Sequence, residues 1–429
     1  MSLKILIVGA GVCGPALAIL LRRANPYHSI TIIERFPSLR AAGQQVDLKT
    51  QAPHILRTMG LLDEIKARCV NETGVEMVDG SGKRVAHFPA SAAGEKRLGL
   101  TSEFEILRGD LVRILYGASV ELGGEVRARL GDKGGEGGGL RYEFGKSIRE
   151  LDQNAKDGVD VTFSNGEKER YDLVVGADGQ GSRTRRLAFG EEASDAAFHS
   201  IGVHGAYFSI PRIEGEGSLA RGHLAPGRRM VFTRTSDRPV TGVLMFTMKD
   251  SPRVKASYKE STENQKEAFA EMFKDTTWQR DRLLRGLQAS DDWYAHELGQ
   301  IKMKHLSIGR VVLLGDAGYC PTPFTGLGTN LCLVGVYVLA GELARHGCHD
   351  VEDALQTYGE KMRPFVDECQ KISSTTLGYF FPTSRLGVWI MQNAMWVVSK
   401  VSGFFPQGQT QDRHDEQLPG YPELNITSL

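Results

Sequence analysis

The chain has 429 residues, of which 41% are hydrophobic and 24% are charged. This length exceeds the size at which one hydrophobic core stops growing, so we expect two or three packed units. Lysine and arginine together number 52, as do aspartate and glutamate, so the sequence carries no general electrostatic footprint for nucleic acid or an anionic membrane. These numbers favour a globular protein whose partners are small molecules.

The N-terminal run Lys4–Val8 is short, rich in β-branched residues and followed at once by glycines, which predicts a buried parallel strand rather than a targeting segment. A helix is expected from Gly14 to about Arg23 and a second strand over Ser29–Ile33, which together give one β-α-β unit. The six cysteines form no CxxC pair and indicate reduced thiols. We therefore expect a cytoplasmic protein without a metal site.

A glycine motif of the form GxGxxG lies between the first strand and the first helix. It consists of Gly9, Gly11 and Gly14, and Glu34 follows the last glycine by twenty residues. The first glycine permits the turn, the second lets a pyrophosphate approach the backbone and the third allows close helix packing, while the glutamate can accept hydrogen bonds from ribose hydroxyls. In this setting the motif predicts dinucleotide binding.

The pattern of apolar and polar residues changes in the middle of the chain. Segments 159–164 and 171–175 flank Asn165-Gly166, a dipeptide suited to a tight hairpin turn because both residues tolerate positive φ. From 196 to 299 short alternating runs predict an antiparallel sheet in a separate module. The sequence then returns to buried elements, a strand and an apolar helix, over 308–315 and 328–346.

Two later stretches indicate which dinucleotide is bound. Segments 174–183 and 311–317 each place an acidic residue at the end of an apolar strand, in the pairs Asp178-Gly179 and Gly315-Asp316. A nicotinamide dehydrogenase would need neither pair. These stretches resemble the DG and GD motifs of the class A FAD-dependent monooxygenases, the group related to aromatic hydroxylases such as salicylate hydroxylase. The resemblance implies FAD as the resident cofactor.

The segment Pro321–Asn330 is similar to the proline- and glycine-rich turn of that family, which lies against the flavin ring and opens the following helix. A helix N-terminus with free N–H groups can stabilise negative charge on a reduced flavin. Arg40, Asp47 and Arg108 lie in stretches that resemble the tetracycline-inactivating branch of the family. By that likeness Asp47 and Arg108 contact FAD and Arg40 contacts a transient NADPH, with a solvated structural role as the alternative for both arginines.

The resemblance implies an α/β fold in which a Rossmann-type, glutathione-reductase-like FAD-binding domain carries an inserted antiparallel-sheet substrate domain and a C-terminal helical segment. We expect the FAD-binding domain over 1–75, 100–195 and 300–370, the substrate-binding domain over 76–99 and 196–299, and a domain-bridging helix with a tail over 371–429. The expected FAD contacts are Gly9, Gly11, Gly14, Glu34, Arg35, Asp47, Arg108, Asp178, Gly179, Gly315, Asp316, Pro323, Gly326, Gly328, Thr329 and Asn330.

By the same likeness the chain is an FAD-dependent monooxygenase. It would use NAD(P)H and O2, through a flavin C4a-(hydro)peroxide, to insert one oxygen atom into an aromatic or polycyclic, polyketide-like substrate. The alternatives are an FAD-dependent oxidase or reductase on the same scaffold and a non-catalytic binding module that keeps the fold. A flavin halogenase is not favoured, because the sequence lacks the W-x-W-x-I-P signature.

The substrate pocket is expected to include Phe324, by its place in the turn, and three residues on predicted strands, Tyr207, Phe232 and Met245. Alternation sends only about half of each strand inward, so core packing is the alternative for the strand residues. No catalytic residue is assigned, because the reactive group belongs to the flavin. His204 is a candidate base toward a phenol, with a structural role as the alternative. Further candidates for the pocket are Met230 and Phe246.

The segment Arg385–Val401 predicts a helix with a narrow polar stripe, because Arg385, Gln392 and Ser399 recur at intervals of seven and are joined by Asn393 and Lys400. Its uncharged core is too short for a transmembrane span, which needs about 20 apolar residues. We expect this helix to pack across the two domains, and we expect no stable membrane insertion.

Overall fold

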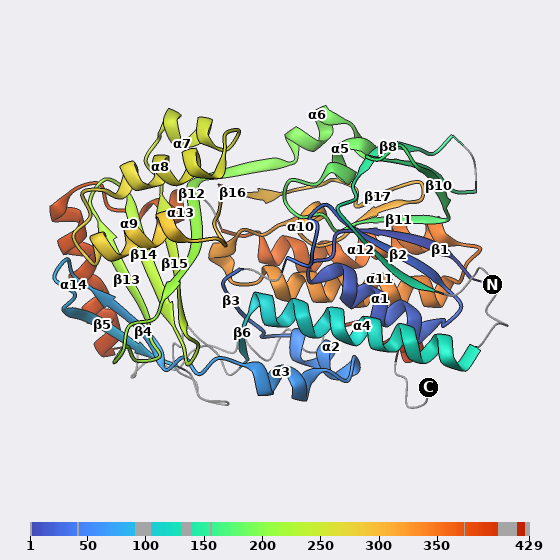
Figure 1. The fold of residues 1–429 in the computed structure, drawn as a ribbon, viewed down its shortest axis with the longest axis horizontal. Helices are drawn as coiled ribbons and strands as arrows, with labels where there is room; N and C mark the ends of the chain where they lie inside the picture. Colours follow the sequence, from blue (N-terminus) through green and yellow to red (C-terminus); the bar gives the residue numbers. More distant parts are fainter. Residues whose placement is uncertain are drawn as a thin grey trace.

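The computed structural model describes residues 2–40, 43–90, 104–130, 139–154, 157–372, 374–401 and 418–424. Two bodies lie side by side along the long axis of the molecule (Figure 1). We name them the dinucleotide domain, which contains the N-terminal β-α-β unit, and the sheet domain, which contains most of the segment 196–299. Two long strands, β12 (Phe198–Pro211) and β16 (Tyr294–Ile301), run between them.

The dinucleotide domain is built on a six-stranded sheet with the order β17-β18-β11-β1-β2-β7. Its strands pair in parallel, except that β17 pairs antiparallel with β18. Apolar, β-branched sequences such as that of β1 suit such a sheet because both of its faces are covered, one by helices and the other by a small antiparallel sheet. The strands are β1 (Lys4–Val8), β2 (Ser29–Glu34), β7 (Leu140–Phe144), β11 (Leu173–Gly176), β17 (Ser307–Ile308) and β18 (Val311–Leu313).

Four long helices pack around this sheet and form its core. α11 contacts both α1 and α12, and α1 also contacts α4. Most residues of α11 are buried, which explains why its sequence is apolar on every side rather than on one stripe. These helices are α1 (Cys13–Ala24), α4 (Arg108–Leu130), α11 (Gly328–His346) and α12 (Val351–Cys369).

A small antiparallel sheet with the order β10-β9-β8 packs on one face of the six-stranded sheet, where Val161 and Tyr171 lie in one cluster with Leu6 of β1 and Val174 of β11. The expected turn joins β9 to β10, but only Gly166 has a positive φ, of 89°. The amide N–H of Gly166 donates to the carbonyl of Phe163, so the hairpin closes through a longer loop with one left-handed glycine. The strands are β8 (Ile148–Asp152), β9 (Val159–Phe163) and β10 (Lys168–Tyr171).

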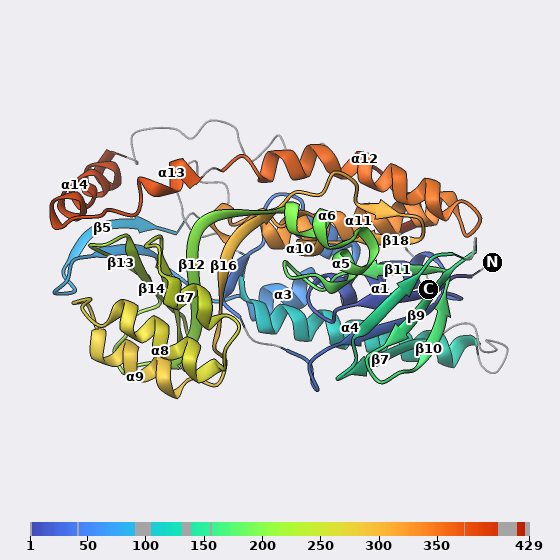
Figure 2. The same ribbon diagram turned by 90° about the horizontal axis from the view of Figure 1, so that it is seen from above.

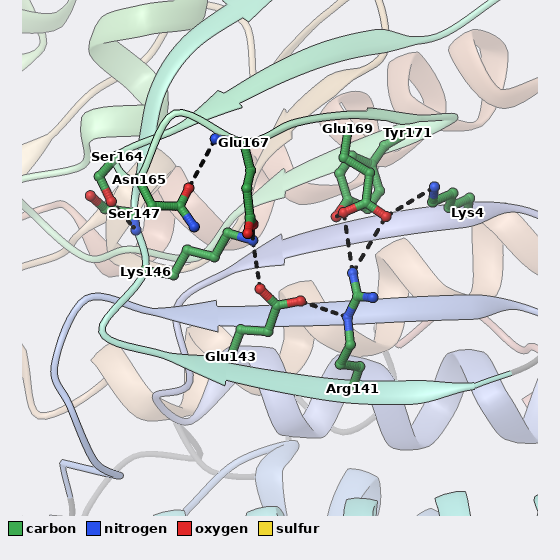
Figure 3. Close-up of polar contacts among 10 residues, drawn as sticks. All are labelled: Lys4, Arg141, Glu143, Lys146, Ser147, Ser164, Asn165, Glu167, Glu169 and Tyr171. Carbon is green, nitrogen blue, oxygen red and sulfur yellow. Dashed lines mark hydrogen bonds and ion pairs between the residues drawn. The ribbon is translucent and has the colours of Figure 1, made fainter.

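Ion pairs join the small sheet to β7 (Figure 3). Arg141 on β7 pairs with Glu143 at 2.6 Å and with Glu169 on β10 at 3.1 Å. Lys146 continues the network by contacting Glu143 and Glu167, each at 2.6 Å. Each exposed pair contributes little by itself, but a connected network orients the two sheet edges relative to one another.

The sheet domain contains a seven-stranded sheet with the order β16-β12-β15-β14-β13-β4-β5. Most neighbours are antiparallel, and the exception is the parallel pairing of β13 with β4. Thus the segment before α4 contributes two strands to a sheet that otherwise comes from residues 198–301. The further strands are β4 (Gly74–Val78), β5 (Arg84–Pro89), β13 (Ala220–Ala225), β14 (Arg229–Thr235) and β15 (Val240–Thr247).

The two faces of this sheet are covered differently (Figure 2). One face packs on α7 (Pro252–Ser257), α8 (Thr262–Phe273) and α9 (Arg280–Ala289). The other face meets the turn around Phe324 and the C-terminal helix α14 (Arg385–Val401), which contacts β5 and β13. No helix in the described parts of the chain is long and apolar enough to cross a membrane.

Shorter elements connect these layers. They are β3 (Gln45–Asp47), α2 (Ala52–Thr58), α3 (Leu62–Arg68), β6 (Glu105–Leu107), α5 (Arg183–Phe189), α6 (Glu191–Ala196), α10 (Asp316–Tyr319), the 3-10 turn η2 (Pro323–Thr325), α13 (Ser374–Gly378) and the 3-10 turn η4 (Pro422–Leu424).

A buried ion cluster joins the two domains where β6 approaches β14. Arg234 on β14 contacts Glu72 at 2.8 Å and also pairs with Glu105 on β6. Burial raises the pKa of Glu105 to about 8; the Arg234 charge opposes this rise, while the nearby carboxylates of Glu72 and Asp47 add to it. One arginine therefore contacts two acidic side chains, and burial favours the protonated form of Glu105.

We expect the Glu105→Gln variant to remove a pH dependence of folding stability. The pKa of Glu105 is higher in the folded protein than in the unfolded chain, so its contribution to stability is full below about pH 4.5 and is lost as the pH rises toward about 8. The slope in the wild type is at most about 1.4 kcal/mol per pH unit. Urea unfolding at several pH values measures it.

The matched comparison is Glu72→Gln, which removes a carboxylate that neutralises Arg234. This variant should lose about 3–5 kcal/mol, as expected when one partner of a buried pair is deleted. An unchanged pH slope in Glu105→Gln would show that Glu105 is ionised in the folded protein.

Candidate functional site

The glycine motif forms a turn whose close contacts exclude any side chain. Gly9 has a φ of +116°, and a Cβ atom there would lie 2.4 Å from the carbonyl oxygen of Ala177. A Cβ atom on Gly14 would lie 2.1 Å from the carbonyl oxygen of Gly9. The absence of a side chain at Gly9 thus allows the end of β1 to lie close to the loop after β11. The absence of one at Gly14 allows α1 to pack closely on the turn.

Gly11 is different, because the space next to it is open to a ligand. A Cβ atom at Gly11 would meet only the guanidinium of Arg108, at 3.5 Å. The first turn of α1 has no side-chain cap and no acidic residue. The backbone N–H groups of α1 and the cation of Arg108 therefore converge on one place, as an anion-binding site requires.

Glu34 at the end of β2 is held in a fixed orientation. Its two carboxylate oxygens accept hydrogen bonds from the backbone N–H groups of Ala10 and Phe36, each at 3.1 Å. The carboxylate keeps further lone pairs, with which it can accept from hydroxyl groups of a ligand. Arg35 is exposed beside it, with its guanidinium 5.0 Å from the ring of Phe36.

The loop after β11 is stabilised by its own aspartate. One oxygen of Asp178 accepts from the hydroxyl of Ser182 at 2.5 Å, and the other accepts from the N–H and the hydroxyl of Thr184, both at 3.0 Å. Gly179 follows with a φ of 82°. The carboxylate of Asp178 therefore orders the entry of α5, and a ligand would meet the loop that it holds.

Arg185, which the sequence motifs did not indicate, connects this loop to the second acidic motif. It is buried, and its guanidinium donates to the carbonyl oxygens of Gln180 and Ala317, both at 2.8 Å. The signal available in the sequence was its position in the helix opened by the DG motif. Arg185 thus connects the loop after β11 to the loop that contains Asp316.

Asp316 occupies a deep position that solvent still reaches. Burial raises the pKa of its carboxyl group, against the opposing effects of a hydrogen bond with Cys320 and of the Arg108 charge. Its side chain is nevertheless exposed to solvent. A group that is surrounded by protein and still accessible lines a cleft. The preceding residue, Gly315, lets the backbone pass close to Cys13 of α1, because a Cβ atom at this position would lie 2.5 Å from the sulfur of Cys13.

The turn between α10 and α11 ends at a helix N-terminus. Pro323 opens η2, Gly326 has a φ of 65°, and α11 begins at Gly328 without a side-chain cap. Thr329 in its first turn is partly accessible. The N–H groups at this end are therefore free of side-chain capping, which suits the negatively polarised edge of a planar ring system.

Asn330 and Asp47 meet through the backbone. The side-chain amide of Asn330 donates to the carbonyl oxygen of Asp47 at 2.9 Å and accepts from the N–H of Lys49 at 2.8 Å. The carboxylate of Asp47 pairs with Lys49 at 2.5 Å. Asn330 therefore holds β3 against α11, and its own amide is engaged on both atoms.

Arg40 lies between the domains. Its guanidinium is 4.8 Å from the ring centre of Phe36 and 5.5 Å from that of Tyr294 on β16. The side chain is exposed, yet burial lowers its pKa and the Arg108 charge lowers it further. It is a cation in a deep, accessible place near a second cation, which suits a visiting anionic ligand.

An aromatic cluster, which we name the aromatic wall, extends from this point across the sheet domain. Tyr207 stacks on Tyr294 at 4.6 Å and on His296 at 5.8 Å, and its edge meets Phe246 at 5.7 Å. Phe246 in turn contacts Phe324 at 5.1 Å. The wall consists of Tyr207, Phe246, Tyr294, His296 and Phe324, with Phe381 packed on Phe324 at 6.1 Å.

The alternation of the strands decides which expected pocket residues reach this wall. Phe232 packs with the same face of the sheet, as does Met230. Met245 is packed instead among the residues under α7, α8 and α9, on the opposite face. The ring of His204 contacts the hydroxyl of Tyr258 at 3.0 Å. The structure therefore brings Tyr207, Phe232 and Phe324 together and does not bring Met245 or His204 to them.

Three polar side chains of the aromatic wall stand out, those of Tyr207, Tyr294 and His296, and the sequence did not indicate the last two. The hydroxyl of Tyr207 is buried without a hydrogen-bond partner among the described residues. Burial lowers the pKa of His296 to about 4 and raises that of Tyr294 to about 12, so both side chains are uncharged near neutral pH. Both rings nevertheless remain partly accessible. The sequence contains no motif on β16. Tyr294 and His296 could be placed beside Tyr207 only once the pairing of β16 with β12 was known.

Comparison with known proteins agrees with this geometry. A family model described as an FAD binding domain matches residues 2–373. The FAD-dependent monooxygenase asL6 of Sarocladium schorii is 40% identical over 433 aligned residues, which cover 99% of this chain and 100% of the relative. A flavin-dependent monooxygenase of Legionella longbeachae is 32% identical over 395 residues, which cover 91% of this chain and 90% of the relative.

A solved structure, that of the tetracycline destructase Tet(51), superposes with a TM-score of 0.73 at 28% identity and covers 97% of this chain and 98% of that chain. These findings confirm the α/β fold and the enzyme class expected from the sequence. The chain therefore belongs to the class A FAD-dependent monooxygenases.

Proposed function

We propose that this monooxygenase takes electrons from NAD(P)H and inserts one atom of O2 into an aromatic or polycyclic compound that lies against the aromatic wall. The observation that carries the proposal is the contact of Phe246 with Phe324. It joins a face of the sheet domain to the turn on which a flavin ring would rest. A planar substrate stacked there would lie beside the reactive edge of the ring.

The described residues fit an extended FAD. Glu34 would hold the ribose of the adenosine part, and the turn at Gly11 with Arg108 would hold the pyrophosphate. Asp316 and the N-terminus of α11 would face the flavin part. When bound, FAD supplies hydride acceptance and oxygen activation. The protein supplies placement, exclusion of water and fixed dipoles.

Arg40 would contact the phosphate groups of NADPH during flavin reduction. Its guanidinium is held by the rings of Phe36 and Tyr294, with its charge directed to an accessible place near Arg108. Such a preset cation suits a partner that binds only briefly. The six free cysteines also fit the reducing cytoplasm, in which NADPH is held.

The polar groups of the aromatic wall would orient the substrate. The hydroxyl of Tyr207 can donate to a carbonyl or phenolate oxygen, and the neutral ring of His296 can accept from a phenolic or enolic hydroxyl. The solved relative Tet(51) is named for action on tetracycline, which is also a polycyclic compound. The wall therefore supports a ring-containing substrate that carries at least one hydroxyl or carbonyl group.

The function is tested by incubating the holoenzyme with NADPH, oxygen-18 gas and a panel of phenols and polycyclic ketones. We expect at least one compound to accelerate NADPH oxidation and to gain one labelled oxygen atom, as measured by product mass. Acceleration that yields only hydrogen peroxide would instead support the oxidase alternative.

With such a substrate, Phe324→Ala should raise the peroxide formed per NADPH more than it lowers NADPH oxidation, because the substrate loses its contact next to the flavin. Phe189→Ala, in the dinucleotide domain away from the wall, is the control. Equal coupling in the Phe324 variant and the wild type would place Phe324 outside the pocket.

We expect Gly11→Val to weaken FAD retention at least about tenfold without unfolding the chain, because an added Cβ atom meets only Arg108 and the valine side chain would occupy the space proposed for the pyrophosphate. Asp316→Ala should act in the same direction. Gly117→Val is the matched control, because nothing lies within 4 Å of a Cβ atom there. Equilibrium dialysis of FAD with circular dichroism of each variant measures both effects.

We expect Arg40→Ala to slow flavin reduction by NADPH about tenfold or more at subsaturating NADPH, while FAD content stays normal. Arg40→Lys should be intermediate, because it keeps the charge and loses the flat stacking on Phe36 and Tyr294. Anaerobic stopped-flow absorbance of the flavin is the measurement, with Arg149→Ala as a surface control. Loss of FAD in Arg40→Ala would reassign this residue to the cofactor.

A further inference from the structure

Helix α14 is an outer element of the sheet domain (Figure 2). Its inner side packs on β5 and β13. Val388, Met391 and Met395 make this contact, with the hydrophobic cluster that also contains Phe246 and Phe324. The positions are separated by three and four residues, so one side of the helix is fully used by the fold.

The opposite side of α14 is apolar as well. Leu386, Ile390 and Val397 share it and are 66%, 54% and 49% exposed. Trp389 and Trp396 lie next to them and are 61% and 50% exposed. We name these five residues the apolar face. It is unusual, because a surface helix normally directs its polar residues to solvent.

The polar stripe of α14 does not occupy the outer side. Arg385, Gln392 and Ser399 are seven residues apart, so they follow one line along the helix. Gln392 and Ser399 are only partly exposed, which places this line at the flank between the packed side and the apolar face. The outward side is thus mostly apolar; the exposed Asn393 also lies on it, and its side-chain amide donates to the carbonyl oxygen of Trp389 at 2.7 Å.

The charged side chains of the C-terminal segment that carries the apolar face are all of one sign. Residues 371–401 contain no aspartate or glutamate. Their cations are Lys371, which pairs with Glu368, and Arg385 and Lys400, which stand at the two ends of α14. Neither Arg385 nor Lys400 has an ion pair with another described residue. An anionic surface would complement this arrangement, whereas a second α14 would bring like charges together without a carboxylate to separate them.

We propose that α14 docks in the plane of a bilayer that carries anionic headgroups. The apolar face would enter the boundary between headgroups and acyl chains, where tryptophan rings are favoured, and Arg385 and Lys400 would reach lipid phosphates. The helix lies on the membrane and does not cross it, in keeping with its 17 residues.

The docking surface continues toward the aromatic wall. Tyr379 and Phe380 are 73% and 48% exposed, and the next residue, Phe381, is buried against Phe324. One short segment, 379–381, therefore carries two exposed aromatic rings next to α14 and one ring that reaches the aromatic wall. Resting on the proposed function, we assign a lipophilic aromatic compound dissolved in the bilayer as the substrate class.

The chain carries its own reporter for the docking experiment. Of its four tryptophans, Trp278 and Trp293 are buried in the sheet domain, and the two exposed ones are both on α14. Vesicles of phosphatidylcholine with about one third phosphatidylserine should shift the tryptophan emission of the holoenzyme to the blue and should carry the protein in flotation. Trp389→Phe with Trp396→Phe should abolish the emission shift.

Two variants separate the apolar and ionic contributions. Ile390→Ser with Val397→Ser should lower the vesicle partition coefficient at least about tenfold. Arg385→Gln with Lys400→Gln should abolish the preference for phosphatidylserine vesicles over pure phosphatidylcholine. The matched control is Ile308→Ser, an exposed isoleucine of the dinucleotide domain, which should bind vesicles like the wild type. FAD content is measured in every variant.

The proposal is overturned if the wild-type holoenzyme does not bind the mixed vesicles. It is also overturned if sedimentation shows a dimer that the Ile390 and Val397 substitutions dissociate, because the apolar face is then an interface between copies. Oxygen incorporation is assayed separately, without vesicles, with the full panel of phenols and polycyclic ketones, which includes water-soluble and lipophilic members. Vesicle binding without incorporation would reject the proposed function and retain the docking, and the reverse result would do the opposite.

Discussion

A buried guanidinium holds together the two loops on which the cofactor site depends. Arg185 donates to carbonyl oxygens of both loops and also to the hydroxyl of Ser194 at 3.0 Å, so its donors are distributed over three segments. Burial lowers its pKa and the carboxylate of Asp178 opposes the change, and an arginine stays charged under such conditions. Loss of this side chain would leave two buried carbonyl groups without donors and would release one loop from the other.

The same junction extends to the sheet domain. The side-chain amide of Gln180, in the loop held by Arg185, donates to the carbonyl oxygen of Glu297 on β16 at 3.0 Å. Tyr294 and His296 are on that strand, so the aromatic wall is positioned relative to the dinucleotide domain by hydrogen bonds as well as by packing. The aromatic wall and the loops of the DG and GD motifs are therefore not positioned independently of one another.

The sequence predicted correctly those elements that depend on residues close together in the chain. Turns with obligatory glycines, such as Gly9, and helices with long apolar runs, such as α11 and α14, depend on residues close together in the chain, and their bounds agree with the structure within a few residues. The pocket side of each strand was not predictable in this way. Phe246 and Met245 are adjacent in sequence but lie on opposite faces, and only the pairing register of β12, β15 and β16 decides between them.

The residue types at the motif positions also did not show which side chains would contact a ligand and which instead hold a loop or strand in position. Asp178 and Asn330 occupy motif positions, but their side chains are engaged by the backbone and by hydroxyl groups of the chain. Both hold a loop or strand that would itself meet the cofactor. Phe324 combines the two roles, because it is fixed between Phe246 of the sheet domain and Phe381 of the C-terminal segment. The ring of Phe324 therefore connects the C-terminal segment to the turn before α11, next to the hydrogen bonds that Gln370 and Gln300 make with the carbonyl oxygens of Cys320 and Pro321.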